Sequence, residues 1–222
     1  MTTMKFNPQD IAENSHPRLP VCLVLDTSGS MEGEPINELN KGVRSFMQEL
    51  LEDEIARYVT DVAIITFGGT VEIITDFSNI ENCTFDKFSA SGRTPLGAAI
   101  NKALDLIDGR TQSYKYNGAE FYDPWICLMS DGKPTDNITT AATRIQSLVQ
   151  ADELKIFPVA IGDGANLNTL NSISPKIKPL KLQGLEFKKF FTWFSQSVIK
   201  ITQSIPGDKV SLSKPTWAEV TI

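Results

Sequence analysis

The sequence predicts an α/β protein: a doubly wound, mostly parallel, Rossmann-like sheet with helices on both faces. Three observations lead to this fold class. Short apolar runs alternate with longer stretches whose apolar residues recur every three or four positions. Several of the runs are unbroken by polar residues, which is typical of strands buried on both faces of a sheet. The runs and the helical stretches follow one another in βα order, which favours parallel pairing.

The first half of the chain predicts three strands and two helices. An apolar run that ends in Asp26 is the first strand, and Pro35 begins a stretch with one apolar face, as expected of an amphipathic helix. Two further runs flank the short joint Gly68-Gly69-Thr70, which predicts a hairpin. In order, we expect a strand at 21–25, a helix at 35–52, strands at 62–67 and 71–74, and a helix that follows Pro95.

The second half repeats this alternation after a polar loop at 111–124 that contains three tyrosines. In order, we expect a strand at 125–129, a helix at 138–150, a strand at 154–161, a weak strand at 178–182 and an apolar closing helix at 185–202. The domain therefore spans residues 19–202, with a polar leader at 1–18 and an extended tail at 203–222. This tail either packs back on the sheet or docks a partner.

The composition excludes several classes of protein. The chain has 21 basic against 27 acidic residues and a formal charge of −6, which argues against a surface built to coat nucleic acid. The longest apolar runs have five residues, whereas a membrane-spanning helix needs roughly 20. The leader contains no apolar core of a signal peptide, so we expect a cytoplasmic protein that binds neither nucleic acid nor membranes.

Side chains that transfer protons near neutral pH are scarce. The single histidine, His16, lies in the polar leader, where a solvated imidazole is the simplest interpretation. Cys22 and Cys127 lie in predicted strands and Cys83 in a loop, without the spacing of zinc ligands, so we expect three small buried or half-buried thiols. We therefore expect a protein that is not an enzyme.

Three polar loops lie at junctions between predicted elements. Asp26-Thr27-Ser28-Gly29-Ser30 follows the first strand, Ser91-Gly92-Arg93-Thr94-Pro95 leads into the second helix, and Ser130-Asp131-Gly132 follows the strand at 125–129. Ligands of doubly wound sheets bind beyond the carboxyl ends of the strands, near the point where the strand order reverses. We therefore expect the three loops to meet in one site.

Together the loops supply two carboxylates and three hydroxyls, all of them hard oxygen ligands. Such a set suits Mg²⁺, which prefers about six oxygens and keeps several waters. If the carboxylates reach the ion only through waters while hydroxyls ligate it directly, the metal stays electrophilic. It then accepts a carboxylate from another molecule, which is a mechanism for adhesion that needs no general base.

In this order and with these flanking elements, the three loops resemble the metal-ion-dependent adhesion site of von Willebrand factor A domains. The resemblance covers residues 19–202. The phrases LDTSGSMEGEPI, SGRTPLGAAI and YDPWICLMSDGKPTD are most similar to the stand-alone bacterial TerY-like proteins of tellurite resistance. The resemblance implies a protein-recognition module in a bacterial stress-response system, often with kinases or phosphatases as partners.

Carried over residue by residue, the resemblance implies that Ser28, Ser30 and Thr94 ligate the metal directly. It also implies that Asp26 and Asp131 bind the metal at least partly through water. The implied ion is Mg²⁺, with Mn²⁺ or Ca²⁺ as substitutes. The implied partner is a protein that offers an Asp or Glu side chain to the ion.

The surroundings of these ligands depart from the family pattern at Arg93, because many relatives have glycine before the threonine. Arg93 either donates to the partner's carboxylate or is a solvated arginine on the rim. We further expect Tyr114 and Tyr116, in the polar loop at 111–124, to be exposed and to form part of a partner surface beside the metal site.

Each candidate ligand also has a purely structural interpretation. Thr94 before Pro95 is typical of a helix N-cap followed by proline. Asp131-Gly132 is typical of a turn, and the segment from Ser28 to Ser30 is compatible with a loop that caps the first helix.

The alternative function is a phosphotransferase of the haloacid dehalogenase type, with Asp26 as its nucleophile. Such an enzyme also begins with an apolar strand that ends in aspartate, and its late acidic loop resembles the segment at 161–166. That class needs a second aspartate two positions after the nucleophile, as a general acid. Here that position holds Ser28, which delivers no proton near neutral pH.

Overall fold

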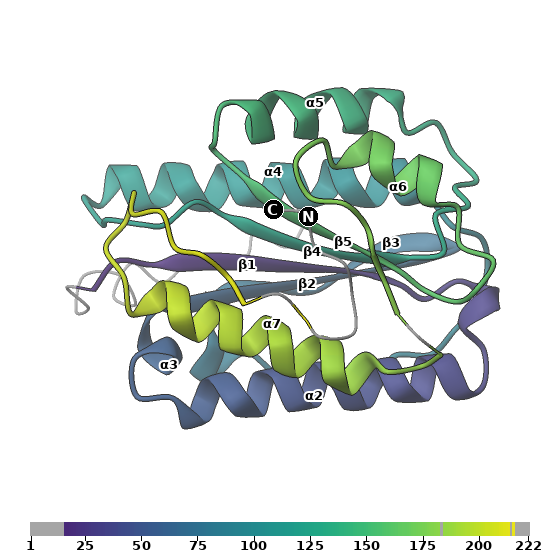
Figure 1. Ribbon diagram of the computed structural model, residues 1–222, viewed down its shortest axis with the longest axis horizontal. Coiled ribbons are helices and arrows are strands. Elements are labelled where there is room, and N and C mark those ends of the chain that lie inside the picture. Colours follow the sequence, from purple (N-terminus) through teal and green to yellow (C-terminus); the bar gives the residue numbers. More distant parts are fainter. Residues whose placement is uncertain (1–15, 183, 214, 216–222) are drawn as a thin grey trace, which may run out of the picture.

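A six-stranded sheet runs through the protein between two layers of helices (Figure 1). The computed structural model describes residues 16–182, 184–213 and 215. The strand order is β3-β2-β1-β4-β5-β6, and all neighbours are parallel except β2 and β3. The strands are β1 (Leu19–Asp26), β2 (Thr60–Gly68), β3 (Thr70–Asn79), β4 (Trp125–Ser130), β5 (Lys155–Ala160) and β6 (Leu180–Lys181). The predicted fold class is confirmed, as is the hairpin at Gly69.

The helices form one layer on each face of the sheet. Those helices are α2 (Glu34–Glu52), α3 (Ala56–Val59), α4 (Leu96–Tyr116), α5 (Thr139–Gln150), α6 (Leu167–Ile173) and α7 (Phe187–Thr202). α2 and α7 cover one face, and α4, α5 and α6 cover the other (Figure 1). The short helices α3 and α6 have no counterpart in the sequence prediction. None of the helices in the described part of the chain is long and apolar enough to cross a membrane.

β1 is the centre of both hydrophobic cores. Its odd-numbered residues, such as Leu23, pack in the core under α2 and α7, and its even-numbered residues, such as Cys22, pack in the core under α4 and α5. The α7 core is rich in aromatic rings, for example the stacked pair Phe46 and Phe194. The apolar closing helix is therefore a core element. The three cysteines are buried free thiols, as predicted.

The strand order reverses between β1 and β4. The chain leaves β1 toward β2 on one side, and the connection after β3 returns through α4 to β4 on the other side. Loops that leave adjacent strands in opposite directions open a crevice beyond the carboxyl ends of those strands. The loops after β1 and β4 therefore flank this crevice.

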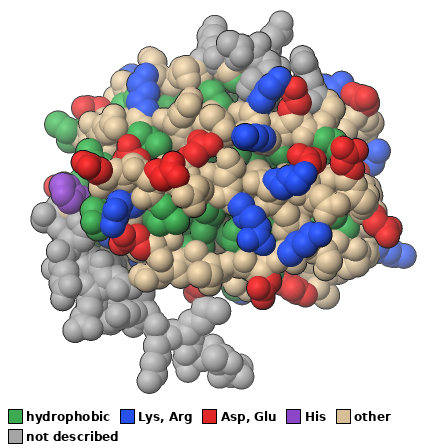
Figure 2. Space-filling model, turned by 90° about the horizontal axis from the view of Figure 1, so that it is seen from below, with side chains coloured by type: hydrophobic (Ala, Val, Ile, Leu, Met, Phe, Trp, Pro, Cys, Tyr) green, Lys and Arg blue, Asp and Glu red, His purple; other side chains and the backbone are tan. Residues whose placement is uncertain are grey.

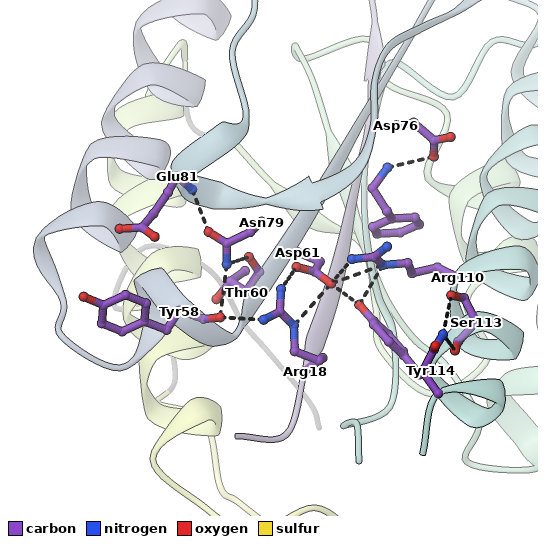
Figure 3. A network of polar contacts seen from close by, with 12 residues as sticks. Arg18, Tyr58, Thr60, Asp61, Asp76, Asn79, Glu81, Arg110, Ser113 and Tyr114 are labelled. Carbon is purple, nitrogen blue, oxygen red and sulfur yellow. Dashed lines mark hydrogen bonds and ion pairs between the residues drawn. The ribbon is translucent and has the colours of Figure 1, made fainter. Parts of the chain in front are cut away.

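Asp61 lies at the amino-terminal end of β2, away from the crevice. Its buried carboxylate is surrounded by three donors (Figure 3). Arg18 and Arg110 both form ion pairs with it, the latter at 2.5 Å. The hydroxyl of Tyr114 donates to the same carboxylate. Burial raises the pKa of Tyr114 well above its usual value, and the negative charge of Asp61 raises this pKa further, so the phenol keeps its proton. This network joins the start of β1, β2 and the end of α4.

The network corrects two of the sequence predictions. Arg18, which we assigned to the polar leader, has its side chain buried in the fold. The segment 111–116, which we assigned to an exposed loop, belongs to α4, and Tyr114 lies in the interior. Both errors have the same cause. The side chains of Arg18 and Tyr114 are buried because Asp61, from another element, supplies their partner, and a local sequence pattern does not show this.

The described part of the tail packs along α7. The indole Nε1 of Trp193 donates to the carbonyl of Ser213 at 2.7 Å, and Nζ of Lys200 donates to the carbonyl of Ser211 at 2.7 Å. Val210 and Leu212 lie against the core under α7. Of the two alternatives left by the sequence, residues 203–213 therefore follow the first and pack back on the domain.

The Asp61 network leads to a first prediction. Asp61→Asn leaves two buried guanidinium groups without a counter-charge, so we expect the free energy of unfolding to fall by about 3–5 kcal/mol in urea denaturation. Glu81→Gln is the matched control, because it removes the exposed ion pair between Arg57 and Glu81, which is worth less than about 1 kcal/mol. Equal effects of the two substitutions would contradict this account of the network.

Candidate metal centre

Asp26 lies at the carboxyl end of β1, and its side chain is held at both oxygens. The residue is 1% exposed. Oδ1 accepts the backbone N–H of Ser28 at 2.9 Å, and Oδ2 accepts the hydroxyl of Ser130 at 2.8 Å. The hydroxyls of Ser28 and Ser30 lie 3.1 Å apart. The loop after β1 therefore places one carboxylate and two hydroxyls together.

Backbone hydrogen bonds join the loop after β1 to the loop before α4. The N–H of Ser91 donates to the carbonyl of Thr27 at 2.8 Å, and the N–H of Gly29 donates to the carbonyl of Gly92 at 3.0 Å. Gly92 has a φ of +71°, and a Cβ on it would lie 2.5 Å from the Cα of Gly69. Only glycine fits this close approach, which holds the second loop against the first.

Thr94 is 7% exposed, and no described residue hydrogen-bonds to its hydroxyl. The structure excludes the interpretation of Thr94 as a helix cap, because the N-cap position of α4 is Pro95. The cap comes instead from Asp136, whose carboxylate accepts the backbone N–H groups of Gly97 and Ala98 at 3.0 and 2.8 Å. The Thr94 hydroxyl is thus left available to a ligand.

The loop after β4 supplies Asp131. Its Oδ1 accepts the backbone N–H of Lys133 at 3.0 Å, so the turn expected at this point exists alongside any ligand role. Ser130 connects this loop to the first, because its hydroxyl donates to Asp26 and accepts the N–H of Gly132 at 3.1 Å. The carbonyl of Thr94 accepts the N–H of Thr135 at 2.9 Å, which ties the second loop to the third.

The electrostatics of this cluster fit a divalent cation. Burial raises the pKa of Asp26, the negative charge of Asp131 raises it further, and hydrogen bonds from Ser28 and Ser130 lower it. Within the described ranges, neither carboxylate forms an ion pair with a lysine or arginine. Two neighbouring carboxylates without a counter-charge, beside the hydroxyl oxygens of Ser28 and Ser30, suit a hard cation such as Mg²⁺.

A metal at this position would depend on the hydroxyls. No group of three His, Cys, Asp or Glu side chains suited to a metal occurs in the part of the chain that the structure describes. The two acidic side chains must therefore be supplemented by Ser28, Ser30 and Thr94. Such a donor set is poor in charge, which leaves the ion able to attract a further anion.

The residues proposed for the partner surface separate into two groups. Arg93 is exposed beside Thr94, and its backbone carbonyl accepts the N–H of Gly69 at 2.7 Å. Tyr114 is buried, and Tyr116 is 91% exposed but lies at the far end of α4. The helix rises about 1.5 Å per residue, so Tyr116 is about 30 Å from the metal loops. The prediction of a tyrosine surface beside the site is therefore wrong.

Ser130 and Asp136 are contributors that the sequence prediction missed. Ser130 directly follows an apolar run, which is a signal that its side chain is buried at the strand end. The capping role of Asp136 left no local signal, because its partners lie 39 and 38 positions earlier in the chain. Both residues hold the loops in place, and neither is among the proposed metal ligands.

The structure gives the phosphotransferase alternative little support. Ser28 occupies the position of the required general acid, and its backbone N–H already bonds to Asp26. In the late acidic loop, the side chain of Asp163 is 97% exposed and faces Lys181 at 3.6 Å. This carboxylate points to solvent.

Comparisons with known proteins agree with the fold. The family profile of the von Willebrand factor type A domain matches residues 21–183. The uncharacterized protein sll0103 of Synechocystis sp. is 25% identical over 170 residues, which cover 73% of this chain and 37% of that protein. The chain spans well under half the length of the curated relatives it matches.

Solved structures show the same fold at lower identity. The pilus adhesin SpaC from Lactobacillus rhamnosus GG, in its open conformation, superposes with a TM-score of 0.66 at 12% identity, covering 85% of this chain and 31% of that chain. The manganese-loaded TRAP protein of Plasmodium vivax superposes with a TM-score of 0.56 at 18% identity, covering 78% of this chain and 73% of that chain. These similarities concern the fold alone.

The close approach at Gly92 leads to a second prediction. Gly92→Ala forces a left-handed backbone on alanine and a clash with Gly69, so we expect the free energy of unfolding to fall by about 2–3 kcal/mol. Gly109→Ala is the control in α4, where a Cβ meets nothing within 4 Å and helix propensity should raise stability by about 1 kcal/mol. Urea denaturation measures both. A neutral Gly92→Ala would show that the loops do not depend on this contact.

Proposed function

Since this chain belongs to the von Willebrand factor type A domain family, we propose that it recognises a partner protein through a bound Mg²⁺ ion. Domains of this family are generally metal-dependent modules for protein interaction. One observation carries the proposal for this chain. The buried carboxylate of Asp26 lies beside Asp131 and the hydroxyls of Ser28 and Ser30, and no lysine or arginine among the described residues forms an ion pair with it.

The proposed ligands are of two kinds, neutral hydroxyls and charged carboxylates. Ser28, Ser30 and Thr94 would hold the ion directly through neutral hydroxyls, and Asp26 and Asp131 would hold it at least partly through water. An ion bound mainly by neutral oxygens supplies Lewis acidity, which attracts the Asp or Glu side chain of a partner. Mn²⁺ and Ca²⁺ are expected substitutes, because both also prefer oxygen ligands.

The charges around the site favour an acidic partner. Arg93 is exposed next to Thr94 and forms no ion pair with a described residue. On the face covered by α2 and α7, Lys and Arg side chains gather over the right-hand half of the view, where both helices begin (Figure 2). Lys41, Arg44, Lys188 and Lys189 are the exposed basic residues in these parts of the helices. Lys41 and Lys189 form ion pairs with Glu38 and Glu186, so Arg44 and Lys188 are the basic side chains in these parts of the helices that would meet an acidic partner.

We also propose the setting of this module. Residues 25–36, 91–100 and 122–136 are similar to the TerY-like proteins of tellurite resistance, which supports a role in a bacterial stress-response system with kinase or phosphatase partners. The three cysteines are free thiols, in keeping with the cytoplasm. The module is proposed to catalyse no reaction of its own, because Ser28 stands where a phosphotransferase needs its general acid.

Metal binding provides the third prediction. Mn²⁺ or Mg²⁺ at a hundredfold over its dissociation constant should stabilise the protein by about 2.7 kcal/mol, which raises the melting temperature by roughly 5–10 °C. Asp26→Ala should abolish this shift. Asp163→Ala, which removes an exposed carboxylate on a neighbouring loop, should leave it intact. A shift that survives in Asp26→Ala would remove the metal assignment.

Partner capture provides the fourth prediction. The immobilised protein should retain an acidic partner from a native lysate in magnesium and release it in a chelator, because the ion supplies the contact. Thr94→Ala should lose the partner, whereas Thr143→Ala, a helix substitution on the α5 surface, should keep it. Turnover of an aryl phosphate that is lost in Asp26→Ala would favour the phosphotransferase instead.

A further inference from the structure

Asn40 is a buried polar side chain on the apolar face of α2. It is 4% exposed and lies one turn after Ile36, beside the core residues Leu39 and Val43. A buried amide is costly unless its polar atoms have hydrogen-bond partners. A leucine would serve packing better at this position, so the amide is explained by the groups that it binds.

The main partner of this amide is the backbone of Phe88, in the connecting segment between β3 and α4 (residues 84–91). Oδ1 of Asn40 accepts the N–H of Phe88 at 2.8 Å, and Nδ2 donates to the carbonyl of Phe88 at 3.0 Å. Nδ2 also donates to the carbonyl of Ile36 at 2.7 Å. The position therefore requires one acceptor and two N–H donors, which a side-chain amide provides and a carboxylate or an alkyl group does not.

The connecting segment has little other support. Among the described residues, the backbone at 85–90 forms hydrogen bonds only through Phe88, and both of them go to Asn40. On the other side of the connecting segment, an open cleft of about 510 Å³ separates it from β2 and β3. The ring of Phe85 stacks on that of Phe88, and the guanidinium carbon of Arg44 lies 5.2 Å from the centroid of Phe85. The connecting segment is therefore held mainly from α2.

The connecting segment leads directly into the loop that carries Thr94. Its last residue, Ser91, donates its backbone N–H to the carbonyl of Thr27 at 2.8 Å, and Thr94 follows three residues later. The helix α2 begins four residues after Ser30, so it continues directly from the first metal loop. Both loops are thus attached to one helix, the first through the chain and the second through Asn40.

We propose that Asn40 is a positioning residue of the metal site, which fixes the connecting segment to α2 and thereby keeps Thr94 in place as a ligand. Without this amide, the connecting segment has no backbone hydrogen bond to α2 and can move into the cleft beside it. Such a movement pulls on the hydrogen bond between Ser91 and Thr27. The consequence for the ion rests on the proposed function, whereas the positioning of the loop is measurable without metal.

The first test measures the dissociation constant of Mn²⁺ by electron paramagnetic resonance of the free ion. Asn40→Leu keeps the approximate size of the side chain and removes both bonds to Phe88, so we expect Mn²⁺ to bind at least about tenfold more weakly. Asn37→Leu is the control for the substitution, because Asn37 is exposed and its amide donates only to the carbonyl of Gly33, at the start of the same helix. An unchanged affinity in Asn40→Leu would overturn the proposal.

A second control separates a displaced loop from a general loss of stability. Val43→Ala removes buried methyl groups from the same face of α2 and also destabilises the protein, but it leaves the bonds between Asn40 and Phe88 in place. The Mn²⁺ affinity of the folded protein should therefore stay unchanged in Val43→Ala. An equal loss of affinity in Val43→Ala and Asn40→Leu would also overturn the proposal. Asn40→Ala, which adds no bulk, replaces Asn40→Leu if that variant does not fold.

The second test follows amide hydrogen exchange by NMR in a chelator. In the wild type, we expect the amides of Phe88 and Ser91 to be protected although they lie outside the helices and strands, because they donate to Asn40 and Thr27. In Asn40→Leu, both amides should exchange at least about tenfold faster relative to those of β1. Retained protection of Ser91 would contradict the positioning role.

The two tests separate this inference from the proposed function. If the wild type binds no Mn²⁺, the metal module fails, and the exchange of Ser91 alone decides whether Asn40 positions the loop. If the wild type binds Mn²⁺ and Asn40→Leu binds it equally well, the metal module stands and the positioning role fails.

Discussion

The two hydrogen bonds to the Asp26 carboxylate decide how the functional end of this protein is assembled. One bond orders the loop that follows β1, and the other fixes that loop to the end of β4. Because β1 and β4 adjoin where the strand order reverses, this carboxylate holds together the two walls of the crevice. The positions of the serine hydroxyls, and of the loop that bonds to Thr27, follow from it.

The protein treats its two buried aspartates in opposite ways. Asp61 receives two guanidinium groups and a phenol, so its charge is compensated within the fold. Asp26 receives only neutral donors, and a second carboxylate lies nearby. A buried charge without a counter-charge is costly. The surroundings of Asp61 are explained by its role in the fold, whereas those of Asp26 are explained by the proposed metal ion. The contrast distinguishes the end of the sheet where a buried charge is compensated from the end where the metal site is proposed.

Local pattern was sufficient to predict most of the fold, and the loops proposed to hold a metal come from the same pattern. The spacing of apolar residues identified the long helices and the core strands, and the joint at Gly68-Gly69 identified the hairpin. Patterns failed where a side chain depends on a distant partner. Arg18 and Tyr114 have ordinary polar surroundings in the sequence, and only the carboxylate of Asp61 makes their burial favourable. Capping of α4 by Thr94 was one interpretation that the sequence left open, and the actual cap, Asp136, could not be predicted because it lies in a later loop.

The long separation between Asp26 and Ser130, 104 positions along the chain, has a consequence for biosynthesis. A growing chain presents Asp26, Ser28 and Ser30 early, but it cannot close the crevice until β4 has been made and has paired with β1. The hairpin of β2 and β3 is local and can form much sooner, whereas parallel pairing must wait for its crossover helix. The crevice is therefore completed late in synthesis, so the proposed metal ligands of a nascent chain come together only after β4 has been made.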